Sequence, residues 1–340
     1  MTVWTELAVC MTMILISGSL LSRYGDIAAE KTGMGRTWIG MILLATITSL
    51  PELATGLSAV TAASAPDLAV GDALGSCVFN LMLIGLIDLF HRPGPILSRV
   101  DQGHILSAGF GVLLIGMAAW GILIPIDQFA AWRLWFGPTT FLILLLYAVA
   151  VRRVFQFEKH RMARNSNGQE GVLLQYQDIP MTRLYRGIAL HGAVIIAAGI
   201  WLPFIGNRIS AITGWGETFV GSLLVAATTS LPEIVTSFAA MRLGAPDLAI
   251  ANLFGSNLFN MAILALDDLA FVEGALLSHV SASHLFSAVA ALMMTGIAIT
   301  GLIYRAQRKA WVTVSWDGAA LILLYLLNLF LLLSSGKPMP

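Results

Sequence analysis

The chain has 340 residues, of which 57% are hydrophobic and 11% charged, and its mean hydropathy is +0.82. These values exclude an ordinary soluble domain, which does not need so much apolar sequence, and they indicate a polytopic membrane protein. The formal net charge is zero, so the overall charge gives no reason to expect a nucleic acid as a partner.

Apolar stretches of about 20 residues, the length that spans a bilayer, occur ten times along the chain. They lie near residues 3–21, 38–63, 67–90, 104–124, 136–151, 185–204, 217–241, 247–270, 283–303 and 317–334. The first stretch lacks the basic start of a secretory signal, so we expect it to remain as a helix. The sequence therefore predicts an all-α membrane protein with about ten transmembrane helices, five on each side of a polar loop.

The two sets of five spans carry the same motifs. The segment Thr48-Ser49-Leu50-Pro51-Glu52 recurs 181 positions later as Thr229-Ser230-Leu231-Pro232-Glu233. The segment Gly75–Asn80 recurs as Gly255–Asn260. Because each half has an odd number of spans, the second half enters the membrane in the opposite orientation. This pattern predicts inverted-topology repeats, an architecture of many secondary transporters.

The repeats define the predicted domain organisation. The first five-helix repeat is residues 1–151, with its motif region at about 35–90. A linker loop at 152–184 follows, and the second five-helix repeat is residues 185–340, with its motif region at about 216–270.

Charge placement predicts the orientation of the chain. If the N-terminus is external, 16 of the 19 Lys and Arg residues fall in cytoplasmic segments, as the positive-inside rule requires. We therefore expect both termini to be external and the central loop to be a cytoplasmic, solvated linker.

Each repeated motif places a proline and a carboxylate inside an apolar span. A proline within a helix leaves the carbonyl four residues earlier without its hydrogen-bond donor. The backbone carbonyls of Ile47 and Thr228 are therefore expected to be free. An ionisable group at membrane depth is a functional candidate by default, so Glu52 and Glu233 in matching places suggest one shared cation site.

The neighbouring polar residues have the spacing to join these glutamates. On a helix, Thr48 and Ser49 share a face with Glu52, and Ser76 shares a face with Asn80. The second copy repeats both relations. The resulting hard oxygen ligands suit calcium, which takes 6–8 of them, and no His or Cys cluster accompanies them to favour a softer metal.

The same residues also have simpler interpretations. The glutamates would then hydrogen-bond to neighbouring hydroxyls and only hold helices together. Asp67 and Asp247, each directly after a proline, are interpreted as helix-start residues. The motif glycines are interpreted as sites of close helix packing.

The paired Ser-Leu-Pro-Glu segments with downstream Gly-Ser-x-x-x-Asn resemble the alpha repeats of the cation/calcium exchanger superfamily, which includes the sodium/calcium exchangers and their prokaryotic relatives. The resemblance implies calcium ligands at Glu52, Glu233 and the carbonyls of Thr48 and Thr229. It further implies sodium ligands or polar lining at Ala45, Ser49, Ser76, Asn80, Ala226, Ser230, Ser256 and Asn260.

The chain departs from the family pattern at several positions. Ile47 and Thr228 replace the usual glycine before the motif, and Cys77 stands where the second copy has Asn257. Asp72 replaces an asparagine that the second copy keeps as Asn252. Neither Asn80 nor Asn260 is a carboxylate, although some relatives have Asp at one of these positions.

The resemblance implies a secondary antiporter that exchanges calcium for sodium by alternating access, expected in a bacterial inner membrane. Calcium/proton exchange remains the alternative, since buried glutamates can bind protons. A passive cation channel and an intramembrane aspartyl-type protease are more remote alternatives. The protease motifs Tyr-Asp and Gly-x-Gly-Asp are missing, so no enzyme activity is expected. The expected partners are the transported ions, calcium with sodium or protons, and the lipid bilayer, with no cofactor.

Overall fold

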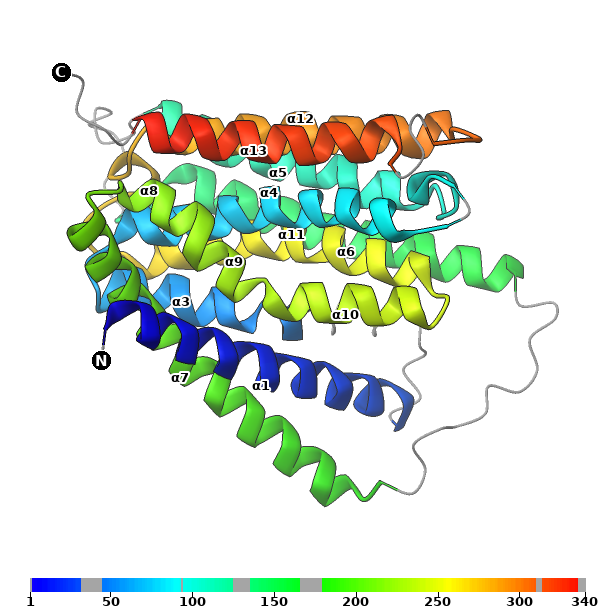
Figure 1. Cartoon of the computed structure of the whole chain (residues 1–340), viewed down its shortest axis with the longest axis horizontal. Coiled ribbons are helices and arrows are strands. Elements are labelled where there is room, and N and C mark those ends of the chain that lie inside the picture. The colour runs from blue at the N-terminus through cyan, green and yellow to red at the C-terminus, as the bar shows by residue number, and fades with distance from the viewer. Residues whose placement is uncertain are drawn as a thin grey trace.

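The computed structural model describes residues 2–31, 45–92, 94–124, 135–165, 179–309 and 314–335. Within these residues the protein is a bundle of helices without strands (Figure 1). Eight of the described helices are long and apolar enough to cross a membrane, and one bent helix pair raises the number to nine. The predicted all-α membrane fold is confirmed.

The spanning helices follow the predicted order. They are α1 (Val3–Lys31), α4 (Pro66–Phe90), α5 (His104–Leu123), α6 (Pro138–Asn165), α7 (Met181–Thr213), α11 (Pro246–Ala270), α12 (His284–Tyr304) and α13 (Trp316–Ser335). The bent pair consists of α8 (Glu217–Val220), the π-helical turn η4 (Gly221–Val225), α9 (Ala226–Thr229) and α10 (Leu231–Arg242). The predicted span 38–63 contributes α3 (Leu50–Thr61), while its residues 38–44 lie outside the described residues.

The helices beside the central loop are longer than hydropathy predicted. The prediction ended one span at residue 151 and began the next at 185, but α6 continues to Asn165 and α7 begins at Met181. Hydropathy detects only the apolar part of a helix, and a polar sequence can continue the same helix outside the membrane. Much of the predicted linker 152–184 is therefore helical, and its residues 166–178 lie outside the described residues.

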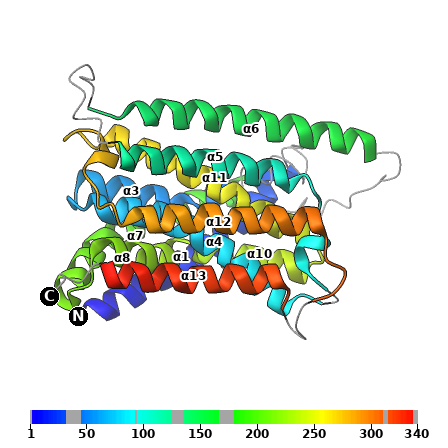
Figure 2. The ribbon, with the colours of Figure 1, turned by 90° about the horizontal axis from the view of Figure 1, so that it is seen from above.

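The helices α4 and α11 run side by side through the middle of the bundle (Figure 1), and they are the most deeply buried of the described spans. On one side of them lie α12 and α13, and on the other side lie α1 and α7 (Figure 1). The helix α6 lies at an edge of the bundle (Figure 2). The start of α1 and the end of α13 lie at one end of the bundle, opposite the end of α6 and the start of α7 (Figure 1).

Close packing at the centre depends on small residues. A Cβ atom added to Gly71 on α4 would lie 3.1 Å from the Cα atom of Gly221 in the π-helical turn. The two helices can therefore approach closely here because both positions are glycines.

Two equivalent contacts between an aspartate and a histidine join the repeats. The Asp67 carboxylate lies 2.8 Å from Nε2 of His284, and the Asp247 carboxylate lies 3.1 Å from Nε2 of His104. Asp67 also accepts a hydrogen bond from the backbone N–H of Ser281, at 2.7 Å. Both aspartates lie in the first turn of a helix, as predicted, but the sequence did not reveal their contacts with the opposite repeat.

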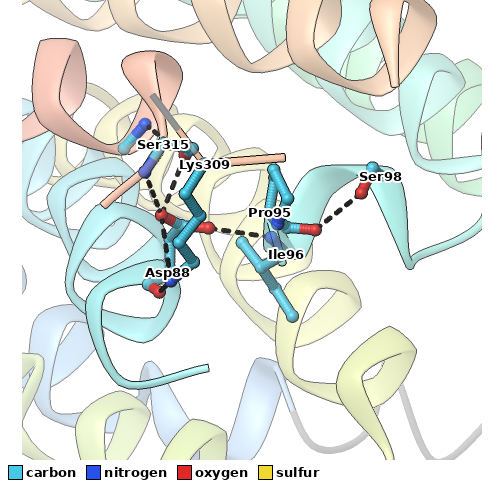
Figure 3. A network of polar contacts seen from close by, with 7 residues as sticks. Asp88, Pro95, Ile96, Ser98, Lys309 and Ser315 are labelled. Carbon is cyan, nitrogen blue, oxygen red and sulfur yellow. Dashed lines mark hydrogen bonds and ion pairs between the residues drawn. The ribbon is translucent and has the colours of Figure 1, made fainter. Parts of the chain in front are cut away.

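A second pair of aspartates holds the chain where α4 and α11 end. Asp88 accepts hydrogen bonds from the backbone N–H of Ile96 and from both the N–H and the hydroxyl of Ser315, each at 2.8 Å (Figure 3). Lys309 lies 3.7 Å from the same carboxylate. Asp268, at the equivalent place in α11, accepts from the backbone N–H of Leu276 at 2.5 Å. These contacts fix the short 3-10 helices η2 (Ile96–Ser98) and η5 (Leu276–Ser278).

Candidate ion-binding site

Both motif helices break at the serine before Leu-Pro-Glu. Ser49 and Ser230 have similar non-helical backbone angles, with φ of −92° and −83° and ψ of 16° and 11°. The second break bends the chain by 46°. Pro51 and Pro232 therefore lie in the first turn of a new helix, where a proline N–H is not needed.

The break also places each glutamate at a helix start. Glu52 lies in the first turn of α3 and Glu233 in the first turn of α10. The positive end of the helix dipole favours a negative charge there. Both side chains are buried, with at most 1% of their surface exposed.

The serines at the breaks bind the glutamate of the opposite repeat. The Ser49 hydroxyl donates to Oε1 of Glu233 at 3.0 Å, and the Ser230 hydroxyl donates to Oε1 of Glu52 at 3.1 Å. These two crossed hydrogen bonds bring the motifs together from 184 and 178 positions apart. This geometry agrees with the prediction that the polar residues of the two repeats meet at one centre.

The helices α4 and α11 contribute further hydroxyls to the same centre. Ser256 donates to Oε1 of Glu233 at 3.2 Å, and Ser230 donates to the hydroxyl of Ser76 at 3.0 Å. The Thr48 hydroxyl lies 3.5 Å from the Ser256 hydroxyl. All of these side chains are buried.

Asp72 adds a third carboxylate at this centre. Its Oδ1 accepts hydrogen bonds from the hydroxyls of Thr229 at 2.8 Å and Ser76 at 3.4 Å. The equivalent residue, Asn252, instead donates to Thr236 at 3.1 Å. The sequence marked Asp72 as a departure from the family pattern but gave no indication of its contact with Thr229.

The amide residues differ between the repeats. Asn80 donates to Oδ1 of Asn257 at 3.1 Å, and Asn257 donates to the carbonyl of Cys77 at 3.2 Å. The second repeat thus has Asn257 where the first has Cys77, and the Asn257 amide links α4 to α11. Neither amide atom of Asn260 has a hydrogen-bond partner among the described residues.

The alanines predicted to offer carbonyls lie in the helical turns before the breaks. The carbonyl of Ala45 accepts from the Thr48 hydroxyl at 3.2 Å and from the Ser49 N–H at 3.1 Å. The carbonyl of Ala226 accepts in the same way from Thr229 at 3.2 Å and from Ser230 at 3.0 Å.

One oxygen of each central glutamate is available to a ligand. Oε2 of Glu52 and Oε2 of Glu233 are buried and have no hydrogen-bond partner among the described residues. The interpretation that both glutamates only hold helices together leaves these two atoms without a purpose. A buried unpaired carboxylate oxygen is costly, and a bound cation would satisfy it.

The chemistry of the centre requires neutral ligands as well as carboxylates. No group of three or more His, Cys, Asp or Glu side chains in the described part of the chain is close enough to hold a metal ion by itself. Hydroxyl, amide and carbonyl oxygens would therefore have to complete a set of 6–8 ligands around calcium.

Two broken helices that meet at a buried polar centre are a design of secondary transporters. A family model described as "Sodium/calcium exchanger protein" matches residues 2–155 and 184–334. Inner membrane protein YrbG of Escherichia coli is 29% identical over an alignment that covers 74% of this chain and 77% of YrbG. Sodium/calcium exchanger MaX1 of Methanosarcina acetivorans is 26% identical over an alignment that covers 94% of this chain and 95% of MaX1.

Solved structures have the same fold. The sodium-calcium exchanger NCX_Mj superposes with a TM-score of 0.61 at 19% identity, over 97% of this chain and 99% of NCX_Mj. The H+/Ca2+ exchanger CAX superposes with a TM-score of 0.69 at 14% identity, over 99% of this chain and 86% of CAX.

The fold and the buried centre thus define a multi-pass membrane antiporter rather than an enzyme. The chain belongs to the sodium/calcium exchanger family, within the cation/calcium exchanger superfamily.

Proposed function

We propose that this protein exchanges calcium for sodium by alternating access, and that calcium binds between Glu52 and Glu233. The observation that carries the proposal is the crossed arrangement of the two glutamates. Each is buried, each is held by a serine of the opposite repeat, and each keeps one oxygen without a partner in the part of the chain that the structure describes. Two carboxylates neutralise the charge of one calcium ion.

The remaining ligands come from the residues around the glutamates. The carbonyls of Thr48 and Thr229, beside the two helix breaks, complete the calcium site in this proposal. Sodium ions share the two glutamates in this proposal, and further ligands are the Ala45 and Ala226 carbonyls and the side chains of Ser49, Ser76, Asn80, Ser230, Ser256 and Asn260.

Competition between the ions follows from this arrangement. Sodium and calcium need the same two glutamates, so the site cannot serve both ions fully at once. The ion that leaves on one side of the membrane is then replaced by the other, as alternating access requires. The proposed orientation has external termini and a cytoplasmic central loop. In support of it, the start of α1 and the end of α13 lie at the end of the bundle opposite the end of α6 and the start of α7 (Figure 1).

Calcium/proton exchange is the second candidate, and Asp72 supports it. With Asp72, the centre has three buried carboxylates. One calcium ion neutralises two of them and leaves one negative charge, which a proton on Asp72 would neutralise. Three sodium ions would neutralise all three carboxylates. Exchange of three sodium ions for one calcium ion and this proton would be electroneutral. Exchange of three sodium ions for calcium alone would carry one net charge and respond to membrane potential, at about 2.3 kcal/mol per charge per 100 mV.

The decisive experiment is calcium flux in vesicles that contain the purified protein. A sodium gradient with pH clamped on both sides should drive calcium against its gradient, and a pH gradient without sodium should not. The matched variant Asp72→Asn should retain sodium-driven exchange and lose any component driven by protons. Calcium movement that follows the pH gradient and ignores sodium would refute the sodium proposal and favour proton exchange. Calcium movement that needs no counter-ion would indicate a channel.

A further inference from the structure

The two ends of the repeat interface differ in charge. One end of this interface is formed by the C-terminal turns of α4 and α10, and we call it the α4–α10 end. The sequence repeat relates it to the end formed by α11 and α3, which we call the α3–α11 end. The two lie at opposite ends of the bundle (Figure 1). Glu52 and Glu233 are buried between them.

The α4–α10 end contains an open, basic cavity. Its volume is about 500 Å³, and its lining includes Ile87, Arg92, Phe238 and Arg242. His91 also lines it, but burial lowers the pKa of His91. The positive charge of the lining therefore comes from the arginines.

At the α3–α11 end, the positions equivalent to these arginines carry no arginine. Val272 corresponds to Arg92 and Thr61 to Arg242. Asp267 occupies the position that is equivalent to Ile87 in the sequence repeat. The helix α3 also packs more closely against α11 than α10 does against α4.

Asp267 is a buried acid without a visible structural role. It has 0% of its surface exposed, and neither carboxylate oxygen has a hydrogen-bond partner among the described residues. The carboxylate lies against Gly56 of α3, with Oδ1 only 2.7 Å from the position that a Cβ atom of Gly56 would take. The charged groups that interact with it electrostatically are Asp72 and Asp268, which are also acidic. No basic side chain among the described residues pairs with it.

Asp267 also lies in line with the central site. It follows Asn260 by seven positions on α11, so the two side chains share a helix face. Gly56 follows Glu52 by four positions on α3 and shares its face in the same way. Asn260 and Thr55, the residue before Gly56, are buried, and within the described ranges they likewise have side-chain polar atoms without partners. Unpartnered polar atoms therefore extend from the central glutamates toward the α3–α11 end.

We propose that Asp267 is a cation-binding position on the route between the central site and the α3–α11 end, and that a divalent cation occupies it on the way to Glu52 and Glu233. This inference rests on the proposed calcium exchange. When the repeats exchange conformations, the α3–α11 end opens and the α4–α10 end closes. The Asp267 carboxylate then lines the entrance, where its negative charge raises the local concentration of cations. The equivalent Ile87 gives the other entrance no such acid.

The test measures calcium exchange from each side separately, in right-side-out and everted membrane vesicles. Asp267→Asn removes the charge and keeps the shape. It should raise the half-saturating calcium concentration about tenfold on the α3–α11 side, since a focused field changes ion capture by 10-fold or more. The value on the opposite side and the equilibrium calcium binding of the purified protein should stay as in the wild type.

A second variant keeps the inference testable if Asp267→Asn fails to fold. Val272 is 79% exposed, so Val272→Arg should fold and place a repelling charge at the α3–α11 entrance. It should raise the half-saturating calcium concentration on that side only, and added salt should reduce the effect. Arg92→Val is the matched control at the other entrance and should act only on the other side.

The outcomes separate this inference from the proposed function. Equal shifts on both sides, or no shift in either variant while the wild type exchanges calcium, would overturn the inference and leave the proposed function intact. A wild-type protein that does not exchange calcium would refute the proposed function, and the inference with it.

Discussion

The replacement Glu233→Gln tests the two-carboxylate site most directly. Glu233 accepts hydrogen bonds from Ser49 at 3.0 Å and Ser256 at 3.2 Å through Oε1, while Oε2 has no partner among the described residues. Glutamine keeps the size of the side chain but removes its charge. Loss of one partner of a buried ion pair costs about 3–5 kcal/mol. At about 1.4 kcal/mol for each tenfold step, calcium should bind roughly 100- to 4,000-fold more weakly.

Calorimetric titration of the purified variant with calcium measures this change. The matched control is Glu217→Gln, which removes the charge of a half-buried glutamate in the same bent helix pair, away from the centre. The control should bind calcium as the wild type does. Calcium binding by folded Glu233→Gln with wild-type affinity would refute the assignment of Glu233 as a ligand.

Three further predictions follow from the contacts between the repeats and from the charge pattern. Ser230→Ala removes the hydroxyl that donates to Glu52 at 3.1 Å, a hydrogen bond to a charged group worth about 1.5–3 kcal/mol. The calcium concentration for half-maximal flux should then rise roughly 10- to 150-fold. An unchanged concentration would show that the hydrogen bond from Ser230 to Glu52 does not support the site. His284→Ala removes the imidazole that contacts Asp67 at 2.8 Å. It should destabilise the folded protein by about 1–3 kcal/mol and so lower the temperature of thermal unfolding in detergent, and an unchanged unfolding temperature would contradict a stabilising role. A reporter enzyme inserted in the loop 152–186 should be cytoplasmic and reporters at both termini external, while an external loop would reverse the orientation.

Much of the site was predictable from the sequence because its main residues lie within short, repeated segments. Glu52 and Ser49 are three positions apart, and their recurrence as Glu233 and Ser230 is enough to indicate a shared centre. The prolines indicated where the helices break, although the structure locates the break at the serine two positions earlier.

The contacts between distant segments were not predictable. His284 lies 217 positions from Asp67, and no local spacing connects the two residues. The position of the Asp267 carboxylate against Gly56 was not predictable either, because Gly56 lies on another helix. The lengths of α6 and α7 were also missed, because a hydropathy profile ends where the apolar sequence ends and the helical hydrogen bonds continue.

The crossed contacts have a consequence for how the chain is built. Ser49 binds Glu233 while Ser230 binds Glu52, and the pairs of Asp67 with His284 and of His104 with Asp247 repeat the same reciprocity. Contacts that recur with the partners exchanged are the mark of an isologous dimer interface. The single chain therefore contains a pseudo-dimer, whose halves recognise each other through their facing surfaces rather than through the segment that joins them. Two polypeptides produced by a cut within 166–178 and synthesised in the same cell should reassemble into one working transporter.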